Sequence, residues 1–351
     1  MFHRSHAMLA IVLLCLAQLA GCGGSAATPA PAPARQKVAV VLPQGTADDK
    51  GFNEFTVKGA REAAAAAGVD FAYLPSQTPA DVEKNIETLV AEGTDAVIAM
   101  GFITGDAIAQ AARRHPEVRF ITDTAYAPGF GCAEQLKDCY SAEGGLSNVT
   151  SLSFAEDEVG YLAGVLAGCM SQSGTIASVA GLEIPPVERF VIGYQAGARS
   201  VRPDIATLNQ YIPDFNDSAT GKVVGLDFIS QGADVIFVAA GNTGNGALLA
   251  ATESGKMAIG VDVDQYLTYP EVKGALLSSA KKNVDVAVGA AVSDFAAGKL
   301  ASGIRLANVA NGGVGLAPYH EWETKISAEC KANVTAAEQA IKANPAITGA
   351  K

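Results

Sequence analysis

Short apolar runs alternate with alanine-rich stretches over most of this chain, and this alternation restricts its fold more than any other feature. The first apolar runs lie at 37–43, 69–74, 95–100 and 118–124, with helical stretches between them at 53–67, 79–92 and 104–115. Continuous apolar strands separated by helices of about 10–15 residues indicate βαβ units with a parallel sheet buried on both faces. This part of the chain therefore predicts one α/β lobe.

A second lobe of the same architecture follows an irregular segment. That segment, 129–151, is rich in Gly, Ser, Cys and acidic residues and shows no clear period. Beyond it we predict strands at 174–181, 209–213, 234–241 and 257–262, and helices at 154–171, 186–200, 218–230 and 244–254. The architecture repeats, although the sequence itself shows no obvious repeat.

The end of the chain suggests that it returns to the first lobe. The run 274–280 and the helix 283–298 come after the second lobe has its share of strands, and 313–318 with the C-terminal helix could cross again. We expect an N-terminal lobe of 37–150 plus about 268–305, and a C-terminal lobe of 151–267 plus about 306–351. Two doubly wound lobes joined by a multi-strand hinge would suit a ligand clamp that closes as two halves.

The first residues are typical of an exported lipoprotein. Arg4 precedes a short apolar run at 8–17, and Leu-Ala-Gly then leads directly to Cys22. This run is too short to span a bilayer stably, so 1–21 is predicted to be a signal peptide and Cys22 the lipid-bearing first residue of the mature chain. The segment 22–36 has no apolar residue larger than alanine and is expected to be an extended tether. We therefore expect attachment to the extracytoplasmic face of the cell membrane.

The charge of the chain argues against nucleic acid as a partner. The formal net charge is −11, and removal of the signal peptide with its single charged residue, Arg4, gives −11 − 1 = −12. A chain this acidic, without a basic run, would repel a phosphate backbone. No run of about 18 apolar residues follows the signal peptide, so no membrane-spanning segment is expected there.

Four cysteines remain after the signal peptide and the lipidation site: Cys132, Cys139, Cys169 and Cys330. Export makes disulfides plausible, and three pairings are open. Cys132 and Cys139 could clip a loop, and Cys169 and Cys330 could then join distant segments. The sequence contains no CxxC and its four histidines are scattered, so no metal site is expected.

Polar residues follow several of the predicted strands directly. They lie at 48–53, Asp123, 239–246, Asp262 and Lys282. In parallel α/β sheets, ligands bind beyond the carboxyl ends of the strands. Each of these residues alone could be a helix cap, a turn former or a solvated surface charge, but together they predict a polar ligand site at the edges of both sheets.

Several motifs, taken together, resemble a known family. "ADDKGFNEFTVKGARE", "EVGYLAGVLAG", "PPVERFVIGYQAGAR", "DVIFVAAGNTGNGAL", "IGVDVDQ" and "SSAKKNVDVAVGAAV" occur in this order. They make the chain similar to the basic membrane lipoprotein family, whose best-understood members are purine nucleoside-binding lipoproteins of ABC importers. The resemblance covers nearly all of the chain beyond the tether. It implies a type I periplasmic-binding-protein fold with three crossovers, a nucleoside in the cleft and permease subunits as partners.

The resemblance also implies roles for individual residues. Phe52 would stack on the base, with the amide of Asn53 beside it. Asp123 would pair with polar edges of the purine, Asp262 would bind ribose hydroxyls, and Lys282 would reach the ribose from the other side.

Further site residues follow from the same resemblance. Asp49 belongs to the turn before Phe52, and Gly241 would let the backbone approach the ligand. Phe190 or Tyr194 would supply a second stacking ring, and this choice stays open. The chain has Asn283 where the family commonly has arginine, and Tyr194 where phenylalanine is usual.

Other functions have less support in the sequence. The chain has no GxSxG and no HExxH, so we expect neither an enzyme nor a cofactor. A simple sugar or riboflavin on the same fold is the main alternative, and a surface sensor or adhesin is another. We predict a monomer that captures purine nucleosides and delivers them to an ABC permease.

Overall fold

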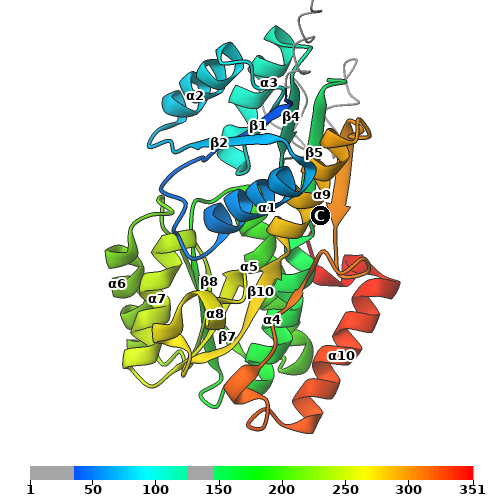
Figure 1. Cartoon of the computed structure of the whole chain (residues 1–351). Coiled ribbons are helices and arrows are strands. Elements are labelled where there is room, and N and C mark those ends of the chain that lie inside the picture. The colour runs from blue at the N-terminus through cyan, green and yellow to red at the C-terminus, as the bar shows by residue number, and fades with distance from the viewer. Residues whose placement is uncertain (1–34, 125–145, 351) are drawn as a thin grey trace, which may run out of the picture. The chain divides into compact units, whose positions relative to one another are not determined.

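A computed structural model describes residues 35–124 and 146–350, which contain two six-stranded sheets (Figure 1). The order of the first sheet is β11 (Gly303–Ala307), β5 (Val149–Phe154), β4 (Arg119–Thr122), β3 (Ala96–Ile98), β1 (Lys37–Val41) and β2 (Asp70–Leu74). All of its neighbouring strands are parallel. Four residues of the inner strand β1, from Val38 to Val41, are fully buried, as expected for a sheet covered on both faces.

The second sheet has the same plan with one antiparallel edge. Its order is β12 (Val314–Leu316), β10 (Leu276–Lys282), β9 (Met257–Asp262), β8 (Val235–Ala239), β6 (Thr175–Ala180) and β7 (Ala206–Tyr211). Only β12 runs antiparallel to its neighbour, β10, among these strands. The prediction of two α/β lobes is confirmed.

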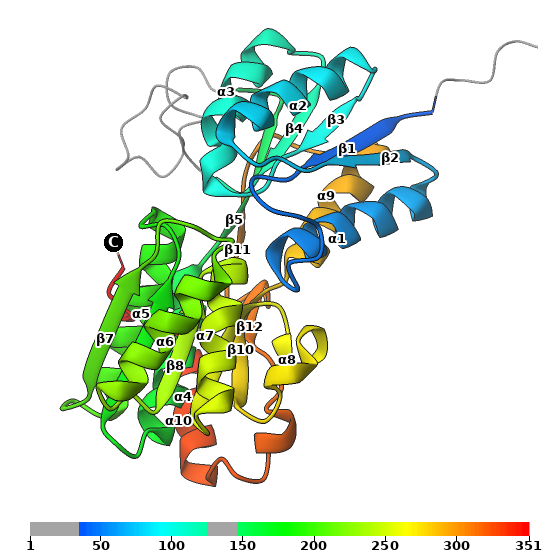
Figure 2. The ribbon, with the colours of Figure 1, turned by 90° about the vertical axis from the view of Figure 1, so that its left-hand side faces the viewer.

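Helices cover both faces of each sheet (Figure 2). The helices α1 (Phe52–Ala67) and α9 (Val284–Ala296) lie on one face of the first sheet, and α2 (Pro79–Ala91) and α3 (Gly105–Arg114) lie on the other. On the second sheet, α6 (Ser218–Ser230) and α7 (Gly241–Glu253) face α4 (Glu156–Met170) and α5 (Pro185–Val201) across the strands. The short helix α8 (Gln265–Thr268) follows β9, and α10 (Ala328–Ala343) packs outside α4.

The chain crosses between the lobes after β5, after β10 and after β11. The crossing segments are hydrogen-bonded to one another or to the strands beside them. Ala155 N donates to Ala307 O at 2.9 Å, and Asn283 N donates to Gly313 O at 3.1 Å. The hinge is therefore built from three segments of backbone.

The strand pairing corrects the predicted lobe boundaries. The strand β10 pairs with β9 and β12 in the second sheet, so the assignment of 268–282 to the N-terminal lobe was wrong, and the return begins at α9. The strand β5 belongs to the first sheet, which moves the first crossing from 150 to about 155. An apolar run suits either buried sheet, because sheet membership depends on partners distant in sequence.

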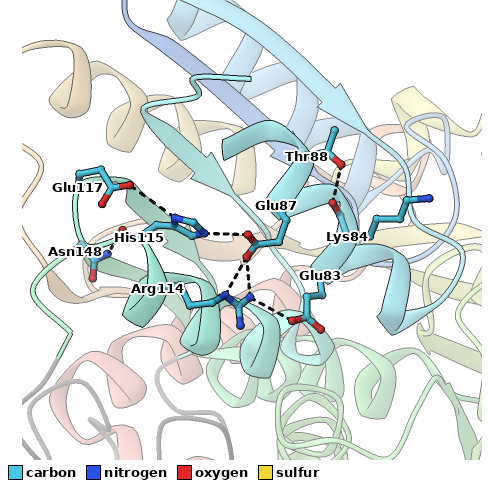
Figure 3. A network of polar contacts seen from close by, with 8 residues as sticks. All are labelled: Glu83, Lys84, Glu87, Thr88, Arg114, His115, Glu117 and Asn148. Atoms are coloured by element: carbon cyan, nitrogen blue, oxygen red, sulfur yellow. Dashed lines mark hydrogen bonds and ion pairs between the residues drawn. The ribbon is translucent and has the colours of Figure 1, made fainter. Parts of the chain in front are cut away.

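A polar network holds the outer helices of the first lobe together (Figure 3). Arg114 donates from Nη2 to Glu87 at 2.7 Å and to Glu83 at 3.2 Å, and His115 Nε2 lies 3.0 Å from Glu87. Buried Asn148 donates from Nδ2 to three backbone carbonyl oxygens at the end of α3 and the start of β4. These bonds fix α3 against β4, whose far end leads to Asp123.

In the second lobe, α4 and α5 pack closely through glycines. A Cβ on Gly164 would lie 2.0 Å from Tyr194 O, and a Cβ on Gly197 would lie 2.0 Å from Tyr161 O. Only glycine permits this backbone approach, which also brings the start of α5 next to the start of α4.

Replacing Gly164 with alanine tests this packing. The added methyl overpacks the contact, so Gly164→Ala is expected to lower the free energy of unfolding by about 1–3 kcal/mol. Gly289→Ala is the matched control, because that position is also helical and an added Cβ would lie 3.5 Å from Gly59 O, an ordinary contact distance. The control is expected to raise stability by up to about 1 kcal/mol, since alanine favours helix. Urea unfolding followed by circular dichroism distinguishes the two, and equal effects would contradict the packing argument.

Candidate ligand-binding site

A cavity of about 320 Å³ lies between the two lobes, where strands of both sheets end. The first lobe lines it with the loop after β1, the start of α1, the turn after β3 and Asp123. The second lobe lines it with the start of α5, the loop after β7, the turn after β8, Asp262 and Lys282. This volume falls at the lower end of the range for pockets that enclose small organic ligands.

The cavity brings together all but one of the predicted ligand-binding residues. Its lining includes Asp49, Phe52, Asn53, Asp123, Phe190, Gly241, Asp262 and Lys282. The remaining residue, Tyr194, is absent from the lining and fully buried elsewhere.

Tyr194 was a wrong alternative for the second ring. It belongs to the core, where its ring stacks on Phe237 with centroids 4.9 Å apart. Burial raises the pKa of its hydroxyl well above the ordinary value. Four residues of helix advance about 6 Å, so α5 presents Phe190 at the cleft and carries Tyr194 one turn deeper. Of the two predicted rings, Phe190 is the one at the cavity.

The carboxylate of Asp49 caps the N-terminus of α1. It accepts hydrogen bonds from the backbone N–H groups of Gly51, Asn53 and Glu54 at 2.9, 3.0 and 3.1 Å. Burial raises the pKa of Asp49 above its ordinary value, and these hydrogen bonds oppose that rise. Asp49 therefore satisfies the free donors of the helix end and fixes the turn that carries Phe52.

The side chain of Asn53 fastens the neighbouring loop. Its Nδ2 donates to the carbonyl oxygens of Gln44 at 2.8 Å and Thr46 at 3.3 Å. The amide nitrogen is thus committed to the protein backbone, and the amide oxygen is the part of Asn53 that could serve a ligand. Phe52, the first residue of α1, is held between these two fixed turns.

Lys282 places a buried ammonium group among carboxylates. Its Nζ lies 3.4 Å from Asp262 Oδ1 and 3.9 Å from Glu156 Oε1, and the Lys282 side chain is only 8% exposed. Burial alone would lower the pKa of Lys282, but the charges of Asp262, Glu156 and Asp123 outweigh it and raise the pKa above the ordinary value. The lysine is therefore a permanent cation. The neighbouring Lys281 does not line the cavity.

Aromatic rings surround the same ammonium group. The Nζ of Lys282 lies 4.7 Å from the ring centroid of Phe52 and 5.5 Å from those of Phe154 and Phe190. A cation over ring faces is stabilised by the ring quadrupoles. The ammonium group of Lys282 therefore interacts with the aromatic rings as well as with the carboxylates of the site.

Asp123 lies at the inner wall of the cavity, just after β4. Its Oδ1 accepts a hydrogen bond from Gly101 N at 2.7 Å. Burial raises the pKa of Asp123 to about 6, against the lowering effects of Lys282 and the Gly101 hydrogen bond. The carboxylate therefore remains an acceptor at neutral pH, with capacity beyond this one donor.

Several residues of the site were missed in the sequence, and two of them bear directly on its chemistry. Phe215 lines the cavity from the loop after β7, and Glu156 supports Lys282 from behind. Phe215 could have been found from its place just after a strand. The sequence predicted that strand at 209–213, whereas β7 ends at Tyr211. The left-handed φ of 53° at Gly241 and its close approach to Phe215 O show that this glycine also makes room for that loop.

Hydrogen bonds between the lobes close the edge of the cavity. Asn245 Nδ2 donates to Asp49 O at 3.3 Å, and Thr268 Oγ1 donates to Lys50 O at 2.8 Å. Gln44 Nε2 donates to Asp214 Oδ1 at 3.1 Å. The turn before α1 thus contacts the second lobe directly, beside the residues that line the cavity.

Three predicted positions lie outside the described residues: Cys22, Cys132 and Cys139. Cys169 and Cys330 are described as free thiols. Within 35–124 and 146–350, no helix has the length and apolar character needed to cross a membrane.

Comparison with known proteins gives a consistent family. Residues 36–345 match the family described as ABC transporter substrate-binding protein, PnrA-like. The "ABC transporter nucleoside-binding protein BmpA" of Lactococcus lactis subsp. cremoris is 31% identical, covering 89% of this chain and 91% of that protein. "Basic membrane protein A2" of Borrelia garinii subsp. bavariensis is 29% identical, covering 78% of this chain and 76% of that protein.

A solved structure agrees with the fold. A solute-binding protein of an ABC transporter system from Aeropyrum pernix K1 superposes with a TM-score of 0.78 at 25% identity, covering 88% of this chain and 92% of that one. The family match spans nearly all of the described chain, and the chain belongs to the PnrA-like family of ABC transporter substrate-binding proteins.

Proposed function

We propose that this substrate-binding protein captures purine nucleosides in the cleft between its lobes and delivers them to the permease of an ABC importer. One observation carries the proposal. A single small cavity combines aromatic side chains from both lobes, Phe52 and Phe215, with the ion pair of Asp262 and Lys282. A flat base joined to a polyhydroxylated sugar is a ligand that needs both.

The ion pair suits the ribose. The carboxylate of Asp262 can accept hydrogen bonds from two vicinal hydroxyls, and such charge-assisted bonds are stronger than neutral ones. Lys282 Nζ, 3.4 Å from Asp262 Oδ1, is placed to donate to the same hydroxyl groups. A ligand without hydroxyls would leave these buried groups without partners, and that loss disfavours it.

The rings and Asp123 suit the base. Stacking of a base on an aromatic side chain contributes about 1–3 kcal/mol. Asp123 is a half-buried acceptor at the cavity that can bind an N–H group on the edge of a purine. Ile103, Ile184 and Val187 complete an apolar wall that a simple sugar would not require.

The charges of the lining favour nucleosides over nucleotides. Among the described lining residues, Lys282 is the only cation, against the carboxylates of Asp48, Asp49, Asp123 and Asp262. This excess of negative charge would repel a phosphate group.

Calorimetric titration tests the proposed ligand class. Inosine, guanosine and adenosine should include at least one tight ligand, and uridine, ribose and riboflavin should bind at least tenfold more weakly. Removing the two vicinal ribose hydroxyls, as in 2′,3′-dideoxyinosine, should weaken binding by roughly 10²–10⁴-fold if inosine binds. Binding of ribose or riboflavin with no response to any purine nucleoside would overturn the proposal.

A variant of Asp262 identifies the group that reads the hydroxyls. Asp262 has a left-handed φ of 63°, so Asp262→Asn is preferable to alanine because asparagine tolerates this conformation. The inosine-to-dideoxyinosine ratio should fall at least tenfold in this variant. Asp264→Asn is the matched control, since Asp264 pairs with His320 and does not line the cavity. An unchanged ratio in Asp262→Asn would remove the ribose assignment while leaving base recognition open.

The pKa of Asp123 predicts a stability gain on its removal. Burial raises the pKa of Asp123 from 3.8 to about 6. Above pH 6 the ionised side chain therefore lowers the free energy of unfolding of the ligand-free protein, and this loss disappears as the pH falls below 4. The difference corresponds to about 3 kcal/mol at pH 8 and about half of that at pH 5. Asp123→Asn should therefore unfold at a higher urea concentration than the unsubstituted protein, most clearly at pH 8, while losing nucleoside affinity. A variant that is less stable at pH 8 than at pH 5, relative to the unsubstituted protein, would contradict this.

We also propose that the protein acts as a monomer held at the extracytoplasmic membrane face by lipid on Cys22, with 22–36 as the tether. The Leu-Ala-Gly-Cys sequence after a short apolar run supports this. Mass spectrometry of the membrane-bound protein should find an N-terminal peptide that begins at Cys22 and carries acyl chains. An unmodified Cys22 peptide would rule the anchor out.

A further inference from the structure

Two cysteines that are distant in sequence meet on the far side of the second lobe. Cys169 lies near the end of α4 and Cys330 lies in the first turn of α10, a sequence separation of 330 − 169 = 161. The two helices pack against each other. Cys330 is buried and Cys169 is half-buried.

The two cysteines line the same cavity, and Asn333 lies beside them. Asn333, three residues after Cys330 on the same face of α10, donates from Nδ2 to Cys169 Sγ at 3.7 Å. A hydrogen bond between the thiols lowers the pKa of Cys169 to about 7 and raises that of Cys330 above its usual value. Cys169 is thus the thiol that ionises first, and the thiolate is the nucleophile in disulfide exchange.

A reagent can reach the pair from outside. A polar cavity of about 320 Å³ lies over both cysteines, with Arg202, Ser327 and Glu329 among its lining residues. Within the described residues, no group of three or more His, Cys, Asp or Glu side chains is placed to hold a metal ion. The pair therefore has the access needed for thiol chemistry and lacks the further ligands of a metal site.

We propose that Cys169 and Cys330 are an oxidation site that becomes a disulfide outside the cytoplasm, joining α10 to α4. The Cys169 thiolate attacks the disulfide of an oxidant, such as a protein disulfide or oxidised glutathione, and forms a mixed disulfide as one oxidant sulfur leaves as thiolate. The Cys330 thiol then loses its proton and displaces the second oxidant sulfur. The pair gives up two electrons and two protons in total, and the oxidant is reduced to two thiols.

This bond would act on stability rather than on ligand binding. The two cavities share no lining residue, so the proposal is independent of the ligand assigned to the cleft. A link across 161 positions removes much of the freedom of the unfolded chain. It would also tie the C-terminal helix to α4, whose other end carries Glu156 beside the hinge.

Peptide mapping of the exported full-length protein tests the proposal. The protein is denatured with iodoacetamide present, digested and analysed by mass spectrometry before and after reduction. A cross-linked peptide joining Cys169 to Cys330, two hydrogens lighter than the two free peptides together, is expected. Alkylation of both thiols after incubation with oxidised glutathione, or a link from either one to Cys132 or Cys139, would overturn the proposal.

Thermal unfolding gives a second measurement. Reduction should lower the melting temperature of the oxidised protein by about 5–10 °C. The double variant Cys169→Ser/Cys330→Ser keeps Cys132 and Cys139, so any response to reductant that remains in it belongs to those two. An equal response in the double variant and the unsubstituted protein would show that the pair is not the linked one. Calorimetric titration with inosine should give affinities that agree within about twofold between the oxidised and reduced forms, and a larger difference would contradict a bond that acts on stability alone.

Discussion

The buried ammonium group of Lys282 is the interaction on which the cleft depends. It lies between Asp262 and Glu156, and Glu156 in turn accepts two hydrogen bonds from Arg189 at 2.7 and 2.9 Å. A buried charge without a partner costs several kcal/mol, and neighbouring carboxylates without a cation would repel one another. The ammonium group and the carboxylates therefore stabilise one another in this buried position, and removing either would destabilise the whole cluster. The rings of Phe52, Phe154 and Phe190 give Nζ apolar neighbours, and an apolar environment strengthens these charge interactions.

This charge cluster coincides with the hinge. Lys282 is the last residue of β10, directly before the chain crosses to the first lobe, and Glu156 is the first residue of α4, directly after the opposite crossing. Glu158, half a turn further along α4, accepts a hydrogen bond from Val309 N at the third crossing, at 2.7 Å. A ligand that contacts Asp262 or Lys282 therefore touches the point where the lobes are joined. The side chains that would contact the ligand are therefore also side chains that set the geometry of the hinge.

The sequence predicted those parts of the fold that depend on local pattern. Most strands and helices were found, because a buried parallel strand is a continuous apolar run and the helices between them are long and rich in alanine. The edge strand β11 was missed, since it alternates exposed and half-buried residues next to a single partner and so lacks a continuous apolar run. The sequence also could not show to which sheet β10 belongs, because its pairing with β9 and β12 depends on the tertiary structure. The same limit explains Glu156, which in the sequence is one of three acids in a helix first turn and becomes a partner of Lys282 only when the lobes are joined.

Several predicted site residues have a shifted pKa or a strained backbone conformation, and both features lower the stability of the fold. Asp123 is a half-buried acid whose pKa is raised to about 6 by loss of hydration, and loss of hydration also raises the pKa of Asp49. Asp262 has a left-handed backbone conformation, as does Lys50 next to Asp49, and such conformations are costly for residues other than glycine. Shifted pKa values and strained backbone conformations are common at functional sites, because the polar groups there find hydrogen-bond partners on the ligand and not within the protein. Their concentration in one small cavity, rather than the shape of the cavity, is the strongest physical reason to place the ligand there.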